Sequence, residues 1–259
     1  MNKAKLGFTL AEVLITLGII GVVAAITLPI LINEHKKTVY VNQLKKTVNT
    51  LENGFKLAMA QDNSDKLTNT ELWLSRGNCN SGDPYDTKCN AFFQNMKKYF
   101  IFENAENRTT PRTFHTLKNT PESGPLRGLW HNEIIMPNGT FISFMRINGG
   151  PSTGIFGPFP DVATLSIDVN GPKRPNQLGR DVFTYGITEY GQVIPYGSVA
   201  AVIACKNAGL DGNCVHNFDQ WVVQYTWSST SNSWSCESIE KDGYFCAARI
   251  MEKGWKMDY

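Results

Sequence analysis

Residues 6–32 read LGFTLAEVLITLGIIGVVAAITLPILI, and the composition of this stretch decides how the chain is organised. Its last twenty positions, residues 13–32, carry no charge. A helix rises about 1.5 Å per residue, so this run spans roughly the 30 Å hydrocarbon layer of a membrane. Lys3 and Lys5 precede the run and favour a cytoplasmic N-terminus. No second apolar stretch of this length follows, so we expect the remaining residues to lie outside the inner membrane.

Glu12 is the residue that a simple membrane segment leaves unexplained. A carboxylate in the hydrocarbon layer costs about 2.5–3.5 kcal/mol on insertion scales unless it is paired. A secretory signal peptide also begins with basic residues, but its apolar region covers only about 7–15 residues and ends at small residues. An ordinary anchor would explain the length of the run without explaining the acid. Glu12 therefore indicates that this helix has a function beyond anchoring the chain in the membrane.

Residues 7–12, GFTLAE, resemble the cleavage and methylation motif of prepilins, the precursors of type IV pilus and type II secretion pseudopilus subunits. The resemblance implies that a prepilin peptidase cuts after Gly7 and methylates the new amino terminus, Phe8. It also implies that Glu12 neutralises the Phe8 amine of a neighbouring subunit in the fibre, because a paired buried charge is tolerable. Pro29 lies where pilin helices commonly carry a proline, which lets a helix bend.

Beyond the membrane segment, apolar residues recur in steps of three and four and predict an amphipathic helix. They are Val41, Leu44, Val48, Leu51, Phe55 and Ala58. We therefore divide the chain into a leader (1–7), an assembly helix (8–32), the amphipathic half of that helix (33–61) and an extracytoplasmic head (62–259). The expected fold class is α+β, in which the long helix packs on an antiparallel sheet and a disulfide-containing C-terminal extension follows.

The head shows turn and strand signals in alternation. Asn138-Gly139 between two apolar runs predicts a tight β-hairpin. The predicted strands are residues 133–136, 140–145, 163–169, 181–188 and 192–194, and the predicted helices are residues 91–102, 199–207 and 219–227. The predicted loops are residues 62–87, 103–128 and 148–160, the last because it holds four Gly and three Pro. This order of strands predicts an antiparallel meander.

Six cysteines lie in the head, and none lies in the apolar run. They are Cys79, Cys89, Cys205, Cys214, Cys236 and Cys246. No CxxC pair occurs, whereas structural zinc sites usually contain closely spaced ligand pairs. Disulfides fit an oxidising compartment outside the cytoplasm better, and we predict pairing between sequence neighbours, each pair closing a short loop. Free buried thiols are the alternative.

Residues 167–183, IDVNGPKRPNQLGRDVF, are the candidate binding segment of the head. They resemble a strand-loop-strand found in the heads of many pilin-like proteins, and some pseudopilins bind calcium in their C-terminal loops. Asp168, Asn170 and Asp181 offer the oxygen ligands that calcium prefers. An Asx-turn is the alternative, in which the Asp and Asn side chains bond to nearby backbone and Gly171 supplies a positive φ. No other cofactor is expected.

Composition narrows the function classes. Lys and Arg number 25, two of them in the leader, and Asp and Glu number 23, so the processed chain has no net charge and nucleic-acid binding is not favoured. No HExxH or GxSxG motif occurs, so the sequence offers no support for an enzyme. The alternatives are a pilus-borne adhesin or DNA-uptake pilin that binds a ligand through its C-terminal region, and an anchored periplasmic enzyme.

The resemblance also implies the surroundings in which the chain works. It implies a single-pass protein of the bacterial inner membrane, with a cytoplasmic N-terminus and a periplasmic head, that later joins a fibre. The implied partners are other pilin or pseudopilin subunits, the prepilin peptidase and the inner-membrane assembly platform. The head is larger than that of a compact major pilin, which by resemblance suggests a minor subunit.

Overall fold

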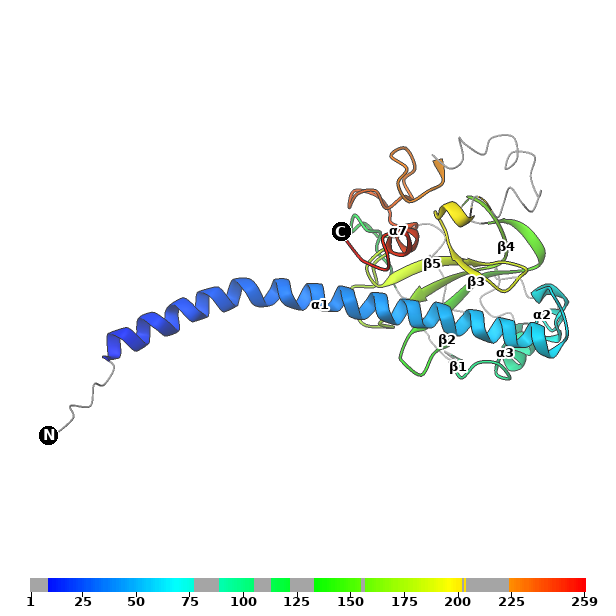
Figure 1. The fold of residues 1–259 in the computed structure, drawn as a ribbon, viewed down its shortest axis with the longest axis horizontal. Helices are drawn as coiled ribbons and strands as arrows, with labels where there is room; N and C mark the ends of the chain where they lie inside the picture. The colour runs from blue at the N-terminus through cyan, green and yellow to red at the C-terminus, as the bar shows by residue number, and fades with distance from the viewer. Residues whose placement is uncertain are drawn as a thin grey trace. The chain divides into compact units, whose positions relative to one another are not determined.

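The computed structural model divides the chain into two units, residues 1–39 and residues 40–259, which are described separately (Figure 1). The structure describes residues 9–76, 89–104, 113–121, 133–154, 157–201, 203 and 224–259, with side chains left out over residues 148–160.

Helix α1 (Leu10–Gln61) has 52 residues and contributes to both units. Within the first unit it continues through Pro29, and its apolar side chains are exposed. Among the described residues, α1 is the one helix long and apolar enough to cross a membrane, and none of its apolar window is buried by the rest of the chain. This confirms the long apolar N-terminal helix.

In the second unit, residues 40–61 of α1 carry the apolar stripe predicted from the sequence. The six apolar residues of the predicted stripe are all buried, together with Thr47 and Gly54. A side chain at position 54 would overlap the ring of Phe100, so the glycine permits this close approach. Glu52 accepts a hydrogen bond from the Val193 backbone N–H (3.0 Å), and Gln43 donates to the Asn138 carbonyl (3.1 Å). Apolar burial and these polar contacts join the helix to the sheet.

The sheet is an antiparallel meander, as predicted, with the strand order β1-β2-β3-β4-β5-β6. The strands are β1 (Glu103–Asn104), β2 (Glu133–Ile135), β3 (Phe141–Gly154), β4 (Gly157–Asp168), β5 (Val182–Ile187) and β6 (Val193–Pro195). The turn between β2 and β3 is built at Asn138-Gly139, where Gly139 has φ 82°. The α+β class is thus confirmed.

The predicted loop over residues 148–160 is wrong. β3 and β4 continue through this segment and pair as far as Gly154 and Gly157. The register shifts three times along the hairpin, after Phe144, after Ile147 and after Thr153. Such irregularities absorb residues that an ideal ladder excludes, because proline and glycine are tolerated at bulges.

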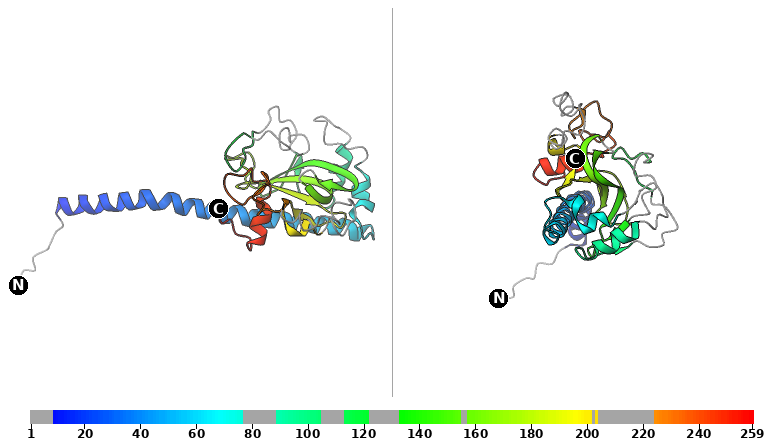
Figure 2. Two further views of the ribbon diagram at one scale, coloured as in Figure 1. Left: turned by 90° about the horizontal axis from the view of Figure 1, so that it is seen from above. Right: turned by 90° about the vertical axis from the view of Figure 1, so that its right-hand side faces the viewer.

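Both faces of the sheet are covered, which explains why every residue of β5 is buried. Phe183, Tyr185 and Ile187 belong to the core shared with α1, whereas Val182 belongs to a second core on the opposite face. The second core also contains Tyr196, Tyr244 and Phe245. The C-terminal segment (red in Figure 2) contributes to both cores, because Ala247 and Ile250 belong to the core shared with α1, whereas Tyr244 and Phe245 belong to the second.

Short helices complete the second unit: η1 (Leu67–Asn69), α2 (Glu71–Leu74), α3 (Asn90–Met96) and α7 (Cys246–Glu252). η1 and α2 lie in the predicted loop 62–87, where Thr70 caps α2 by accepting a hydrogen bond from the Trp73 N–H (3.2 Å). The helix predicted over 91–102 ends early, at Met96, and α7 was not predicted. Residues 199–201 are helical. The remaining parts of the helices predicted over 199–207 and 219–227 lie mostly outside the described residues.

Candidate functional site

Glu12 lies in the first turn of α1 and closes a capping box with Thr9. Its Oε2 accepts hydrogen bonds from the Thr9 backbone N–H (2.8 Å) and from Thr9 Oγ1 (2.7 Å). Thr9 Oγ1 in turn accepts a hydrogen bond from the Glu12 N–H (3.3 Å). The carboxylate therefore lies at the positive end of the helix dipole and is already hydrogen-bonded within its own chain. Gly7 and Phe8 lie outside the described residues.

Sequence reasoning missed the role of Thr9, although the T-x-x-E spacing is the usual signature of a capping box. The other hydroxyls of the apolar segment also bond within the helix. Thr16 donates to the Glu12 carbonyl (2.9 Å) and Thr27 to the Val23 carbonyl (2.9 Å). Because these polar groups are satisfied internally, the outer surface of the helix remains suited to lipid or to another helix.

The comparisons with known proteins concern this same segment. Residues 2–28 match the family model described as the prokaryotic N-terminal methylation motif. The chain carries the prepilin-type cleavage and methylation signal. This signal is the one found in type IV pilins and pseudopilins, and it accounts for both the apolar length and Glu12. No curated protein and no solved structure matches the chain, so the assignment rests on the signal and on the helix that contains it.

The prepilin-type signal implies assembly with other pilin-type subunits and processing by a prepilin peptidase. A protein of this type is typically structural rather than enzymatic. The apolar helix agrees with a membrane-anchored pilin.

The C-terminal extension is closed by a disulfide between Cys236 and Cys246, which confirms one of the three predicted pairs. The two residues are ten positions apart in the sequence, and both are fully buried. Cys89 is also disulfide-bonded, but its predicted partner, Cys79, lies outside the described residues. The predicted pair of Cys205 and Cys214 likewise lies outside them.

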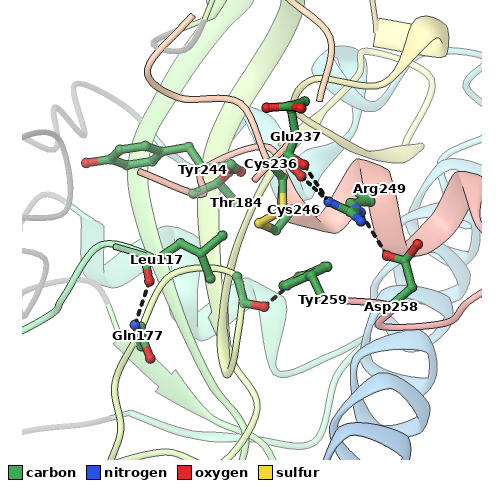
Figure 3. Close-up of a disulfide and its surroundings, with 11 residues drawn as sticks. Leu117, Gln177, Thr184, Cys236, Glu237, Tyr244, Cys246, Arg249, Asp258 and Tyr259 are labelled. Carbon is green, nitrogen blue, oxygen red and sulfur yellow. Dashed lines mark hydrogen bonds and ion pairs between the residues drawn. A yellow bond between two sulfur atoms is a disulfide. The ribbon is translucent and has the colours of Figure 1, made fainter. Parts of the chain in front are cut away.

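Arg249 of α7 holds the disulfide loop and the C-terminus together (Figure 3). Its Nη1 donates to the carbonyls of Cys236 (2.7 Å) and Glu237 (3.0 Å), while its Nε pairs with Asp258 Oδ1 (2.8 Å). Its guanidinium also lies 5.0 Å from the centre of the Tyr259 ring. The Arg249 side chain thus connects the disulfide loop to the C-terminal residues.

The C-terminal residue reaches back to the candidate binding loop. The Tyr259 hydroxyl donates to the Gly179 carbonyl (2.6 Å). Gly179 has φ 75°, and a side chain at this position would overlap the Cys246 sulfur. The disulfide, Tyr259 and the loop around Gly179 therefore form one packed arrangement, and sequence reasoning did not foresee it.

The structure places the three proposed calcium ligands in and beside that loop. Asp181 Oδ2 accepts the Asn176 backbone N–H (2.9 Å), and Oδ1 accepts the Gln177 N–H (2.6 Å). Burial raises the pKa of Asp181, although these backbone bonds and the Asn170 side chain oppose the shift. Asp168 is buried at the end of β4.

Asn170, the third proposed ligand, forms hydrogen bonds to both a side chain and the backbone. Its Nδ2 donates to the Tyr40 hydroxyl (3.1 Å) and to the Arg174 carbonyl (3.3 Å). Within the described ranges, no group of three or more His, Cys, Asp or Glu is placed to hold a metal ion. Calcium would have to use oxygen lone pairs that these bonds leave over. The calcium site is therefore an untested expectation, and the bonds to nearby backbone favour its alternative, the Asx-turn.

A buried acid, Asp161, lies on the second face of the sheet and was not singled out in the sequence. Its Oδ1 pairs with Arg146 Nη2 (2.6 Å), and its Oδ2 accepts hydrogen bonds from Thr164 (2.5 Å) and from the Tyr196 hydroxyl. Burial raises the pKa of Asp161, against the opposing charge of Arg146. Because its oxygens face an arginine and two hydroxyls, we interpret this cluster as part of the second core rather than as a catalytic site.

Proposed function

We propose that the chain is the precursor of a structural subunit of a type IV pilus or a type II secretion pseudopilus. In this proposal it enters the inner membrane with its head in the periplasm. A prepilin peptidase then removes residues 1–7 and methylates Phe8, and an inner-membrane platform adds the subunit to the fibre. The observation that carries the proposal is the match of residues 2–28 to the methylation motif, on a helix whose apolar surface is exposed.

Glu12 guides the assembly of single subunits into the fibre. In the isolated chain its carboxylate is bonded to Thr9, which lowers the cost of keeping it near the membrane surface. When subunits stack, the processed Phe8 amine of a neighbour offers a positive charge, and a charge pair inside an apolar fibre is favoured over a lone carboxylate. The pairing sets the axial position of each subunit relative to the next.

Cohesion of the fibre comes from the rest of the apolar segment. Once a subunit leaves the bilayer, residues 13–32 would face water unless neighbouring helices cover them. Burial stabilises at about 25 cal/mol per Å² of apolar surface, so an exposed helix of this length strongly favours packing among its copies. The small residues Gly18 and Gly21 leave open space for a neighbouring helix, since a Cβ added to either glycine would meet no other atom within 4 Å.

The head favours a minor subunit over the main building block. It is larger than the head of a compact major pilin, and beyond the sheet it carries a C-terminal segment with its own disulfide and arginine contacts. The adhesin or DNA-uptake alternative stays a prediction for the same segment. A salt-dependent shift of DNA by the purified protein would support it.

An exchange of Glu12 for glutamine separates a fibre subunit from an anchored enzyme. We expect Glu12→Gln to leave the protein folded and membrane-inserted but to reduce its incorporation into filaments sharply. Glu34→Gln is the matched control, since Glu34 is an exposed acid on the same helix, paired with Lys37 outside the apolar run. Normal filaments from Glu12→Gln, measured by shearing and immunoblotting, would contradict the proposal.

A further inference from the structure

The loop closed by the second-unit disulfide presents an apolar side chain to solvent. Ile239 is 55% exposed and lies in a turn between two exposed acids, Glu237 and Glu240. A single exposed isoleucine is ordinary on a protein surface. Here, however, it is displayed on a loop that the rest of the fold holds in place.

Several bonds fix that loop. Arg249 binds the Cys236 and Glu237 carbonyls, and the Lys241 N–H donates to the Ser238 carbonyl (3.3 Å) to close the turn. Lys241 Nζ also donates to the Thr230 carbonyl (2.5 Å). A loop whose backbone is already held in one conformation loses little conformational freedom when it binds, which favours association.

An apolar groove lies elsewhere on the same unit, between α1, the segment after α3 and the turn joining β2 to β3. It has a volume of about 330 Å³. Its lining residues are Lys46, Thr47, Thr50, Tyr99, Phe100, Ile101, Met136, Pro137 and Asn138. Lys46 is the charged residue among them and is exposed, and Ile101 is 80% exposed.

The groove and the Ile239 loop complement one another in polarity and in charge. A small apolar side chain flanked by two carboxylates matches an apolar cavity with a lysine beside it. Interfaces of this kind have an apolar centre and a polar rim, and much of their binding energy comes from side chains that fill pockets.

The two surfaces cannot meet within one chain. Segment 224–245 lies at the top of the head in Figure 1 and in the right view of Figure 2, whereas β1, β2 and α3 lie at the bottom in both. A contact between them must therefore join two copies through different patches. Such a heterologous contact extends into an open filament wherever its rotation does not close into a ring.

We propose that Ile239 of one subunit inserts into the groove of a neighbouring copy, where Glu237 and Glu240 lie beside Lys46. The inference rests on the proposed function, because it requires copies to meet in a fibre. The contact requires at least two consecutive copies of the chain in the fibre.

Photo-crosslinking in filament-forming cells tests the contact with the full chain. A benzoylphenylalanine at position 239 should crosslink to a second copy, and peptide mapping should place the link at residues 99–101 or 136–138. The reciprocal probe at position 101 should link to residues 237–241, which keeps the test usable if one variant fails to fold. Leu74, 65% exposed on α2, is the control position and should not give the same link.

Charge reversal tests the rim. Lys46→Glu should lower the yield of the position-239 crosslink roughly two- to fivefold, as expected for an exposed ion pair. Adding Glu237→Lys and Glu240→Lys should restore it. Lys56→Glu, an exposed lysine of the same helix that does not line the groove, should leave the yield unchanged.

The outcomes are distinguishable from those of the proposed function. Filaments that form with no link, with a link to another region of the chain, or with a link to a different protein would overturn this contact but leave the fibre proposal standing. A chain that keeps its leader and never enters filaments would overturn both.

Discussion

Removing the guanidinium of Arg249 should destabilise the second unit substantially. Arg249→Met keeps most of the length and apolar volume of the side chain. It deletes the two hydrogen bonds to the Cys236 and Glu237 carbonyls and the ion pair with Asp258. The side chain of Arg249 is only 14% exposed, so water cannot fully replace these bonds.

The magnitude follows from the contacts. A hydrogen bond from a charged donor contributes about 1.5–3 kcal/mol, and the lower value applied to two carbonyls gives about 3 kcal/mol. The ion pair adds little, because Asp258 is 31% exposed and exposed pairs contribute about 0–1 kcal/mol. For a unit of this size, a loss of about 3 kcal/mol lowers Tm by roughly 6–12 °C.

Thermal unfolding of the detergent-solubilised full chain, followed by near-ultraviolet circular dichroism, measures this change. Lys253→Met is the control, since Lys253 lies 5.5 Å from the Trp227 ring centre but has an exposed position on the surface. It should cost at most about 1 kcal/mol. A Tm for Arg249→Met within about 2 °C of the unaltered protein would refute the reasoning, because it would mean that the loop and C-terminus do not depend on this cation.

Three further predictions concern the same region. Burial raises the pKa of Asp258, but the hydrogen bond and charge of Arg249 outweigh burial and lower it, so the stability from this pair is present above about pH 4 and is lost as pH falls through the folded pKa. Asp258→Asn should therefore flatten the acid side of a plot of Tm against pH. An unchanged plot would contradict this prediction. Replacing Cys236 and Cys246 by serine should cost about 3 kcal/mol, the loop-closure entropy expected for residues ten apart, measured by urea unfolding; a loss below about 1 kcal/mol would contradict it. Because both oxygens of Asp181 accept backbone N–H groups, calorimetric titration with calcium should give no saturable heat, whereas a saturable heat would establish a calcium site.

The parts of the fold that were predicted correctly are those with a repeating signal. The α1 stripe follows from steps of three and four, and its residues are all buried. The β2–β3 hairpin follows from the turn signal at Asn138-Gly139, although the loop is one residue longer than a two-residue Asn-Gly turn: the Gly139 N–H donates to the Met136 carbonyl, and Gly139 supplies the positive φ. β5 was recognisable as well, because its aromatic and β-branched residues suit a strand buried on both sides.

The errors have a common physical origin in tertiary context. Glycine and proline over residues 148–160 indicate a loop when read locally, yet pairing of two long strands outweighs that preference by means of bulges. The helix over 91–102 ends at Met96, and Phe100 then turns back to pack on α1 at Gly54. The local sequence shows neither that β3 and β4 pair nor that Phe100 packs against Gly54.

The candidate site was predicted unevenly for a related reason. Glu12 was identifiable because an acid in an apolar run is costly and so demands an explanation. Thr9 was overlooked, although its spacing from Glu12 could have indicated the capping box. The contact of Tyr259 with Gly179 joins residues eighty positions apart and could not be foreseen without the fold.

Mass spectrometry of the intact protein, purified from filaments or from membranes of cells with an active prepilin peptidase, tests the central claim most directly. The account predicts a chain that begins at Phe8, has lost residues 1–7 and carries one additional methyl group on its amino terminus. A mature protein that still begins at Met1, or that is cut beyond the apolar run as a secretory signal peptide would be, would contradict it.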